Sequence, residues 1–304
     1  MSILVDKESR IIVQGITGRE AVSFVADSLG YGAKIVGGVT PGKAGMDVHG
    51  VPVYNCVRDI TGKERVDIAV ISVPPAFVKD AAFEALQNGV PLIVVITERV
   101  ARADVVQVLE LARQRGARVI GPNTMGLISP GKSKAGSVGG PPQDARKAFV
   151  RGPVGIMSRS GGMTTEIANL LTQNRLGQST AISVGGDPII GSTFVELLPL
   201  FEADPETKAV VLFCEPGGSM EKPLTDYIKA NGTRLPIVAF IAGRFADAMP
   251  GVRFGHAGSI VQGKQDTAAA KVELFREAGI AVAEEFSEIA TILKERLGDG
   301  KHVY

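Results

Sequence analysis

The sequence predicts an α/β protein in which helices cover largely parallel sheets. Short runs rich in Val and Ile, closed by Gly or Pro, alternate with amphipathic stretches along the chain. The length of 304 residues suffices for two domains with separate cores. The 37 glycines lie mainly after predicted strands, at the edge where open α/β sheets bind ligands. We therefore expect the function to reside in the loops at that edge.

The predicted elements fall into two groups. Residues 1–130 read as a Rossmann-like domain, with strands at 10–15, 33–39, 67–74, 91–97 and 117–123 and helices between several of them, such as 20–30 and 103–116. Residues 131–152 are rich in Gly and Pro and lack periodicity, so we expect them to connect two domains. The pattern restarts in residues 153–304, with strands at 154–160, 180–186, 209–215 and 236–243 and helices at 163–175, 191–203, 264–279 and 287–298.

The balance of charges argues against polyanionic partners. With 33 Lys and Arg against 32 Asp and Glu, the net charge is +1, and no basic run suggests nucleic acid or an anionic membrane. The N-terminus lacks the apolar stretch of a signal peptide, so a cytoplasmic protein is expected. Cys56 and Cys214 are far apart in the sequence, which favours a reduced compartment and, with only 3 histidines, predicts no metal site.

A turn after the first predicted strand has the features of a phosphate site. Residues 15–20 read GITGRE and open a helix whose first backbone N–H groups can bind an anion. Lys43 follows the second strand, where NAD-binding domains carry Asp or Glu. This basic residue favours a ligand with an extra phosphate and disfavours an NAD-dependent dehydrogenase. Ala44 occupies the position where a P-loop needs a hydroxyl for Mg²⁺, which argues against an NTPase.

Further strand ends extend the same edge. Pro74 and Pro75, Thr97 and Glu98, and Asn123 follow the next three predicted strands. Together with the turn at Thr17, they predict one elongated nucleotide crevice.

A second anion site is predicted in the other half of the chain. Ser158, Ser160, Gly161 and Gly162 end a strand and open a helix, leaving helix-start amides uncovered. The loops 185–188 and 215–218 follow the neighbouring strands and should lie beside it.

His256 is the sharpest single signal. It lies in the sequence RFGHAGS, where small neighbours give the ring little to pack against. A histidine facing an anion site, with a carboxylate such as Glu215 to orient its other nitrogen, suits a nucleophile that is transiently phosphorylated.

These motifs occur in an order that resembles the α-subunit family of succinyl-CoA synthetase, the acid–thiol ligases. The matching segments are VQGITGRE, VGGVTPGKAG, VITE, GPN, SRSG, VGGDPI, EPGG and GHAG, and the resemblance runs from Ser2 to about Leu297. It implies a CoA-binding Rossmann-like domain followed by a flavodoxin-like ligase domain. It also implies an enzyme that is active only with an ATP-grasp β subunit, which would bind ATP or GTP with Mg²⁺.

The resemblance also implies roles for individual residues. The positions that match the family's CoA site are Thr17, Gly18, Arg19, Glu20, Lys43, Ile96, Thr97 and Glu98, and Asn123 is expected beside them. His256 matches the phosphohistidine, Glu215 its partner carboxylate, and Ser158, Ser160, Gly161 and Gly162 the residues that cradle the phosphoryl group. In that scheme phosphate passes from the nucleotide to His256, then to the substrate acid, and the CoA thiol displaces it.

Three segments depart from the usual family pattern. SRSGTLTYE, GPNCPG and APKGKRMGHAG are replaced by SRSGGMTTE, GPNTMG and AMPGVRFGHAG, which are similar to ATP-citrate lyase and the small subunit of citryl-CoA synthetase. Gly162 replaces a Thr and Thr165 a Tyr, so the pocket has room for a larger acid. Citrate is therefore favoured, with Arg159, Thr164, Thr165 and Arg253 as candidate ligands.

Other assignments remain open. The chain lacks a citrate synthase-like C-terminal domain, so the reaction is expected to stop at citryl-CoA. Succinate is the alternative acid, and a catalytically silent CoA-binding regulatory module is a more remote one, against which the intact GHAG motif and Glu215 argue.

Overall fold

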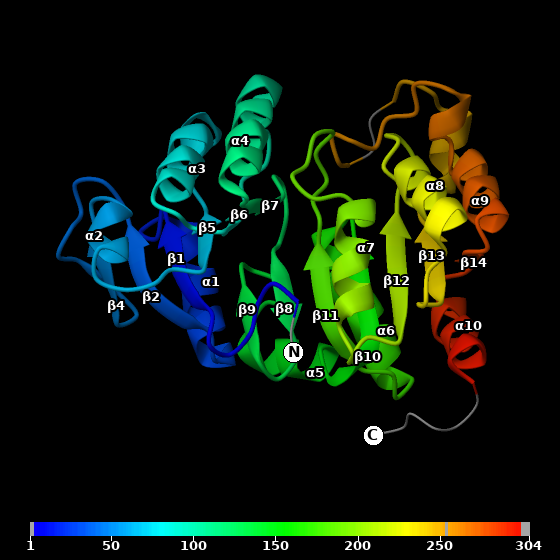
Figure 1. Ribbon diagram of the computed structural model, residues 1–304, viewed down its shortest axis with the longest axis horizontal. Helices are drawn as coiled ribbons and strands as arrows, with labels where there is room; N and C mark the ends of the chain where they lie inside the picture. Colours follow the sequence, from blue (N-terminus) through cyan, green and yellow to red (C-terminus); the bar gives the residue numbers. More distant parts are fainter. Residues whose placement is uncertain (1–2, 253–254, 299–304) are drawn as a thin grey trace.

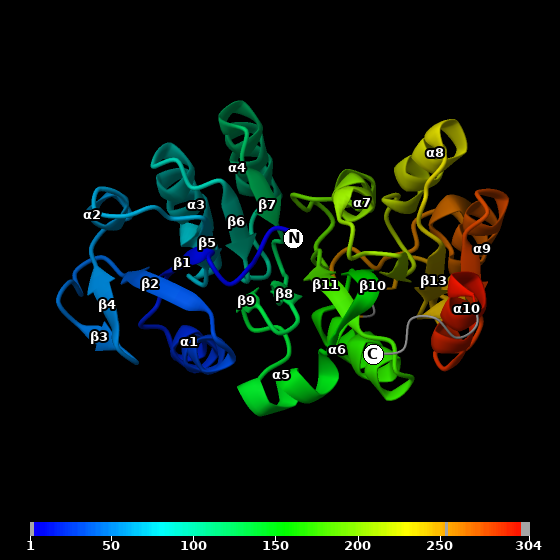
Figure 2. The ribbon, with the colours of Figure 1, turned by 60° about the horizontal axis from the view of Figure 1, so that its bottom comes forward.

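The computed structural model describes residues 3–252 and 255–298. Within this part of the chain the strands form two seven-stranded sheets, which lie side by side with helices on both faces (Figures 1 and 2). Both sheets are dominated by parallel pairs, which confirms the predicted α/β class.

The first sheet has Rossmann topology. Its order is β3-β4-β2-β1-β5-β6-β7, so the parallel strands follow the sequence 3-2-1-4-5-6 typical of dinucleotide-binding folds. The strands are β1 (Arg10–Gln14), β2 (Lys34–Val39), β3 (Asp47–Val48), β4 (Val51–Tyr54), β5 (Ile68–Ile71), β6 (Leu92–Val95) and β7 (Arg118–Ile120). The short β3 and β4 were not predicted, because neither is long enough to show a period.

Alternating side chains of β1 bind the helices to the two faces of this sheet. Ile11 and Val13 belong to the same buried cluster as Phe24 of α1, whereas Ile12 packs in the cluster that contains α3 and α4. The helices are α1 (Arg19–Tyr31), α2 (Arg58–Thr61), α3 (Val78–Gln87) and α4 (Arg102–Arg115), with a 3-10 turn at Pro75–Phe77.

The second sheet has flavodoxin-like order. β10 (Arg151–Ser158), β11 (Gln178–Ser183), β12 (Ala209–Cys214), β13 (Ile237–Ile241) and β14 (Ala281–Ala283) run parallel in the order 2-1-3-4-5. The helices are α6 (Gly161–Gln173), α7 (Phe194–Ala203), α8 (Glu221–Asn231), α9 (Ala268–Glu277) and α10 (Glu288–Leu297), and 3-10 turns lie at Arg244–Ala248 and Lys264–Asp266. Buried Ile156 of β10 packs with α6 and α10, whereas Met157 lies in the cluster that includes α7, α8 and α9.

The expected connecting segment, residues 131–152, is instead part of the folded core. β8 (Leu127–Ser129) and β9 (Ser133–Ala135) form a hairpin that pairs antiparallel with β11, and α5 (Pro142–Ala148) follows. The expected boundary at residue 130 thus falls inside this hairpin. Its strands are too short and too rich in Ser to show a period, yet Ile128 and Lys134 are fully buried.

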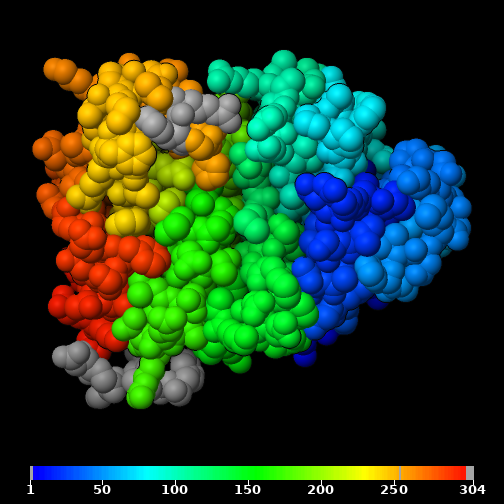
Figure 3. Space-filling view, turned by 180° about the vertical axis from the view of Figure 1, so that it is seen from behind, coloured from blue at the N-terminus to red at the C-terminus, as the bar shows by residue number. Residues whose placement is uncertain are grey.

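The hairpin lies between the two halves of the molecule. Ser28 of α1 donates a hydrogen bond to the carbonyl of Gly136, and Tyr31 accepts one from the amide of Gly131. In the space-filling view the green middle part of the chain, to which the hairpin belongs, lies between the blue N-terminal residues and the red C-terminal residues (Figure 3). Among the described helices, none is both long and apolar enough to cross a membrane.

Candidate functional site

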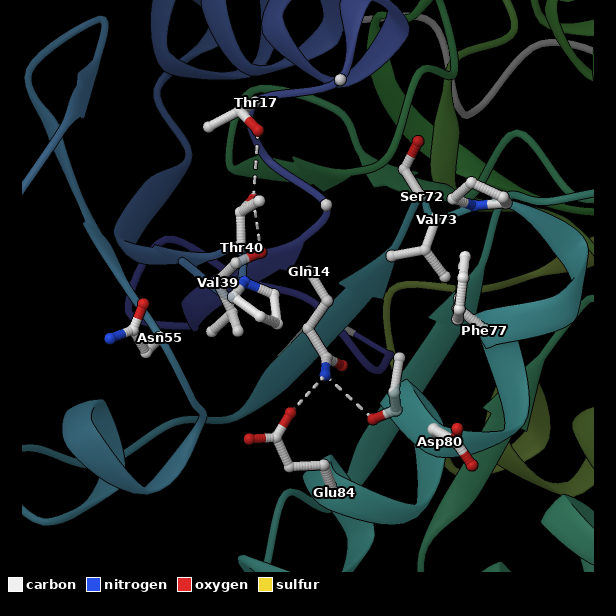
Figure 4. Close-up of a pocket in the computed structure, with 15 residues that line it drawn as sticks. Gln14, Thr17, Val39, Thr40, Asn55, Ser72, Val73, Phe77, Asp80 and Glu84 are labelled. Carbon is white, nitrogen blue, oxygen red and sulfur yellow. Dashed lines mark hydrogen bonds between the residues drawn. The ribbon is translucent and has the colours of Figure 1, made fainter. Parts of the chain in front are cut away.

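A cavity of about 750 Å³ lies at the C-terminal edge of the first sheet. It lies where the strand order reverses beside β1, which is the expected ligand position in this topology. Its lining includes Thr17, Gly18, Thr40, Ser72 and Phe77, drawn from the ends of β1, β2 and β5 and the start of α3 (Figure 4).

Polar groups at one end of this cavity suit an anion. The Lys43 ammonium donates to the hydroxyl of Thr17 at 3.1 Å, and that hydroxyl lies 3.3 Å from the hydroxyl of Thr40. No side chain caps the start of α1, where Gly18 is the N-cap, so its first amides are open to a ligand. The site therefore offers a cation and helix-start amides together, as a phosphate requires.

A second cavity of about 610 Å³ continues the first. Both contain Gly18, Ser72, Val73 and Pro74, so the two form one elongated crevice. Its lining includes six more residues expected at the CoA site, namely Arg19, Glu20, Ile96, Thr97, Glu98 and Asn123, whereas Lys43 lines neither cavity and reaches the first only through Thr17. The Thr97 hydroxyl donates to the carbonyl of Val73 at 2.7 Å, so this side chain shapes the wall.

Sequence reasoning missed several residues of the crevice. Gln14, Asn55, Phe77, Asp80 and Glu84 all line it. Figure 4 shows the Gln14 amide directed at Glu84, and its nitrogen donates to the Ala81 carbonyl at 2.9 Å. Only Gln14 could have been found from the sequence, because a polar residue at the end of the apolar run RIIVQ indicates a side chain at the ligand edge of the sheet.

The second site is built around His256 and Glu215. Nδ1 of His256 lies 2.8 Å and 3.0 Å from the two carboxylate oxygens of Glu215, at the end of β12. The hydroxyl of Ser259 donates to the same carboxylate. The side chains are 27% exposed for His256 and 16% for Glu215, so the ring is reachable while the carboxylate is largely covered.

The environment of Glu215 keeps its carboxyl ionised. Burial alone raises the pKa, but hydrogen bonds from His256 and Ser259 and the charge of Arg159 outweigh it, so the pKa lies below its usual value. An ionised carboxylate only accepts hydrogen bonds, so Nδ1 carries the proton. In a neutral imidazole the other ring nitrogen, Nε2, then keeps its lone pair, as a nucleophile requires.

Gly186 allows the His256 ring to occupy this position. A Cβ at Gly186 would lie 2.5 Å from the ring carbons, and the Gly186 carbonyl accepts from the amide of Gly258 at 3.0 Å. The loops after β11, β12 and β13 therefore meet at the place where the predicted loops 185–188 and 215–218 were expected.

Arg159 is buried beneath these loops and does not face an open pocket. It is 3% exposed, and its guanidinium lies 3.3 and 3.4 Å from the carbonyls of Asp187 and Gly186. A Cβ at Gly258 would lie 2.3 Å from its Nη2 atom. Backbone carbonyls thus engage Nη2 of Arg159, whereas its Nε is buried without a hydrogen-bond partner, so the role of Arg159 as a ligand of the substrate acid stays a prediction.

The start of α6 is assembled differently from the expectation in two respects. The Ser158 hydroxyl donates to the Ser160 carbonyl and accepts from its amide, so Ser158 shapes the turn from within. The Thr164 hydroxyl also donates to the Ser160 carbonyl, at 2.7 Å, and Thr164 is fully buried. Neither hydroxyl is presented to a ligand.

The other residues of this helix start remain available. Ser160 is the N-cap, and its hydroxyl accepts from the Met163 amide at 3.4 Å. Gly161 packs against Met125, whereas Gly162 is exposed and has no atom within 4 Å of the position of a Cβ. Thr165 is half-buried, and Arg253 lies outside the described residues.

A direct contact joins the crevice to the histidine site. The amide of Asn123, which lines the crevice, donates to the carboxylate of Asp187 at 3.0 Å. The Gly186 amide in turn donates to the Asn123 carbonyl at 3.1 Å. In the described part of the chain, no group of three or more His, Cys, Asp or Glu side chains is arranged to hold a metal ion.

Comparison with known families agrees with this division into two sites. Residues 6–99 match the CoA binding domain family, and residues 157–281 match the CoA-ligase family. The first match contains the Lys43 site and the second contains His256.

Whole proteins resemble the chain over nearly its full length. The succinate–CoA ligase [ADP-forming] subunit alpha 1 of Archaeoglobus fulgidus is 44% identical over 95% of this chain and 96% of its own. An ADP-forming sulfoacetate–CoA ligase subunit of Bilophila wadsworthia is 42% identical over 98% of this chain and 100% of its own.

A solved structure agrees with the fold. ATP citrate lyase from Methanothrix soehngenii, in complex with citrate and coenzyme A, superposes with a TM-score of 0.88 at 25% identity over 99% of this chain. This chain spans 53% of that longer chain.

Proposed function

The chain belongs to the family of ADP-forming succinate–CoA ligase α subunits, and we propose that it carries the phosphohistidine of a two-subunit ligase that makes citryl-CoA. The observation that carries the phosphohistidine is the pairing of His256 Nδ1 with the Glu215 carboxylate at 2.8 Å. The proposal for the acid rests on the open space at Gly162.

CoA occupies the crevice of the first domain in this proposal. Lys43 and the amides at the start of α1 neutralise its phosphates, and Thr17 and Thr40 supply hydroxyls beside them. The crevice extends past Thr97 towards Asn123, whose contact with Asp187 leads to the histidine site. When bound, CoA supplies the thiol that displaces phosphate from the activated acid.

His256 transfers the phosphoryl group. Nε2 attacks the terminal phosphoryl group of the nucleotide, forming an N–P bond as the bond to the leaving diphosphate breaks. Glu215 holds the ring through Nδ1 and stabilises the positive charge that develops on it. A substrate carboxylate then takes the phosphoryl group, which yields an acyl phosphate and restores the imidazole.

The amides at the start of α6 stabilise the transferred group. Gly161 and Gly162 place helix-start N–H groups beside small side chains, where the helix dipole favours an anion. A separate β subunit with an ATP-grasp fold binds ATP or GTP with Mg²⁺, so this chain alone is inactive.

Citrate is the proposed acid. Gly162 leaves open space beside the phosphate-binding helix start, and Thr165 lies one turn further along α6. The structural likeness to an enzyme solved with citrate and coenzyme A supports the same choice.

Succinate is the second candidate. The relative from Archaeoglobus fulgidus, at 44% identity, is named a succinate–CoA ligase subunit, and one changed pocket residue discriminates only modestly between acids. Donation from Arg159 and Thr164 to the backbone carbonyls of Asp187 and Ser160 also weakens the support for citrate. A catalytically silent CoA-binding module is not favoured, because the His256–Glu215 pair is assembled.

The acid is tested on the native complex, isolated through a tag on this chain. Citrate, succinate, malate and sulfoacetate are each offered with ATP, Mg²⁺ and CoA, and the thioester is identified by mass. Citryl-CoA as the main product supports the proposal, whereas succinyl-CoA as the main product overturns the citrate assignment.

A further inference from the structure

A buried ion pair lies directly behind the loop that carries Glu215. Lys271 of α9 and Glu221 at the start of α8 lie 2.9 Å apart, with side chains only 2% and 1% exposed. Neither residue lines the crevice, and neither contacts His256. Taking two charges out of water is costly, so a pair this deeply buried calls for an explanation other than stability.

The remaining contacts of Lys271 supply that explanation. Its ammonium donates to the backbone carbonyl of Glu215 at 2.8 Å and to that of Gly217 at 2.7 Å. Glu221 lies beside the same ammonium as its counter-charge, although its two buried carboxylate oxygens accept no hydrogen bond. The side chain thus binds the main-chain carbonyls of the residues before and after Pro216.

The loop has little else to fix its conformation. Gly217 and Gly218 have positive φ angles of 84° and 69°, so their backbone is permissive. The Gly217 amide donates to the carbonyl of Asp266, in the turn that precedes α9. The loop is therefore anchored to α9 and its leading turn from two sides, and Glu215 is the residue whose direction these anchors set.

We propose that Lys271, neutralised by Glu221, is a positioning residue that fixes the main chain of Glu215 and so holds its carboxylate against Nδ1 of His256. The inference rests on the proposed function, because it concerns the phosphorylation of His256. Lys271 touches neither the substrate nor the phosphoryl group and acts only through Glu215.

Two double variants of the native complex separate hydrogen bonding from charge. Lys271→Gln with Glu221→Gln is neutral but keeps two N–H donors for the two carbonyls. Lys271→Met with Glu221→Met is neutral and of similar size but offers no donor. The exposed pair Lys229–Glu277, which also joins α8 to α9 at 3.1 Å, provides a matched control as Lys229→Met with Glu277→Met.

The rate of His256 phosphorylation by ATP and Mg²⁺ is measured, together with kcat for the thioester and KM for CoA. The Met pair is expected to slow phosphorylation and kcat about tenfold or more, since a misplaced orienting group costs much of its catalytic effect. KM for CoA should stay within about twofold, because the crevice is untouched. The Gln pair and the control pair should stay within about threefold of the wild type for both rates.

Three results would overturn the positioning role. They are a Met pair that phosphorylates at the wild-type rate, a Gln pair that falls as far as the Met pair, and a Met pair that loses CoA binding and phosphorylation together. The last result would assign the ion pair to folding. His256→Ala in the same complex distinguishes the two proposals. If the chain is still phosphorylated in His256→Ala, the proposed function fails. If His256→Ala is not phosphorylated but the Met pair reacts at the wild-type rate, only the positioning role fails.

Discussion

Nδ1 of His256 and the carboxylate of Glu215 lie 2.8 Å apart, although 41 residues separate them in the sequence. The flavodoxin-like order of the second sheet brings them together, because Glu215 follows β12, His256 lies in the loop after β13, and these two parallel strands are neighbours. The contact fixes which ring nitrogen is protonated and which is free.

Removing the charge of Glu215 should impair phosphorylation. Glu215→Gln keeps an oxygen near Nδ1 but cannot stabilise the imidazolium, so we expect His256 phosphorylation to slow about 100-fold. The rate is followed by intact mass in the native complex. Glu273→Gln, an exposed position on α9, serves as the control and should change nothing. A normal rate in Glu215→Gln would exclude the carboxylate from the chemistry.

Filling the space next to the ring should have a similar effect. In Gly186→Ala the new methyl group would lie 2.5 Å from the His256 ring carbons, so the ring must move away from Glu215. We expect the rate of thioester formation to fall at least about tenfold with CoA affinity unchanged. The matched control is Gly263→Ala, where no atom lies within 4 Å of the added carbon. Equal rates in the two variants would contradict the packing argument.

The side chain at position 162 should set the choice of acid. Gly162→Thr restores the residue that succinyl-CoA synthetases usually carry and fills the open space at the start of α6. The ratio of kcat/KM for citrate to that for succinate should fall roughly tenfold, as a change of one or two pocket atoms allows. Kinetics with both acids on the same preparation would test this. An unchanged ratio would show that the substitution does not govern specificity.

Lys43 should contribute to CoA affinity. Lys43→Ala removes the cation beside Thr17, and we expect CoA to bind about tenfold more weakly, with a smaller dependence on ionic strength. Calorimetry on the full chain measures this directly. Lys208→Ala, an exposed lysine of the second domain, is the charge-matched control. If Lys43→Ala bound CoA with wild-type affinity, Lys43 would not contact the phosphates, and these would have to bind elsewhere in the crevice.

Lys134 should give the fold an unusual dependence on pH. Burial lowers the pKa of Lys134 to about 8, and the charge of Asp27 offsets only part of that effect. Between this value and the unfolded pKa of about 10.4 the unfolded chain holds the proton and the folded chain does not. The free energy of unfolding should therefore rise with pH in this window.

The contribution of Lys134 to the pH dependence of stability has an upper limit, and a variant without the amine measures it. The rise should be roughly 3 kcal/mol at most, and it should be absent in Lys134→Met. Urea unfolding of both proteins from pH 7.5 to 10.5 gives the comparison. Parallel pH profiles would show that the folded chain keeps this lysine protonated.

Much of the fold could be predicted because its strands are buried on both faces. Runs such as IAVI in β5 and LIVV in β6 are apolar at every position, which is a strong signal even in single sequences. The hairpin β8–β9 gave no such signal, because its buried residues include Ser129 and Lys134, whose polar groups are buried through hydrogen bonds. The expected linker was therefore wrong as a description of residues 131–152.

Some residues of the candidate sites could be predicted from the sequence and others could not, because only some of them leave a local signal. Strand-end glycines and a framed histidine are local signals, so Gly18 and His256 could be found directly. Whether a side chain faces the ligand depends on tertiary contacts, and these turn Arg159 towards the carbonyl of Asp187 and Thr164 towards that of Ser160. Lys271 lies 56 residues from the carbonyl of Glu215 that it binds, and no sequence pattern connects them.

The most direct test of the account is to locate the phosphoryl group. The native complex is incubated with ATP and Mg²⁺ and digested at alkaline pH, where phosphohistidine survives, and the modified peptide is identified by mass. The account predicts one phosphoryl group on Nε2 of His256 that is discharged when the acid and CoA are added together, with an equal amount of acyl-CoA formed. Thioester formation in a complex whose His256 never becomes phosphorylated would contradict it.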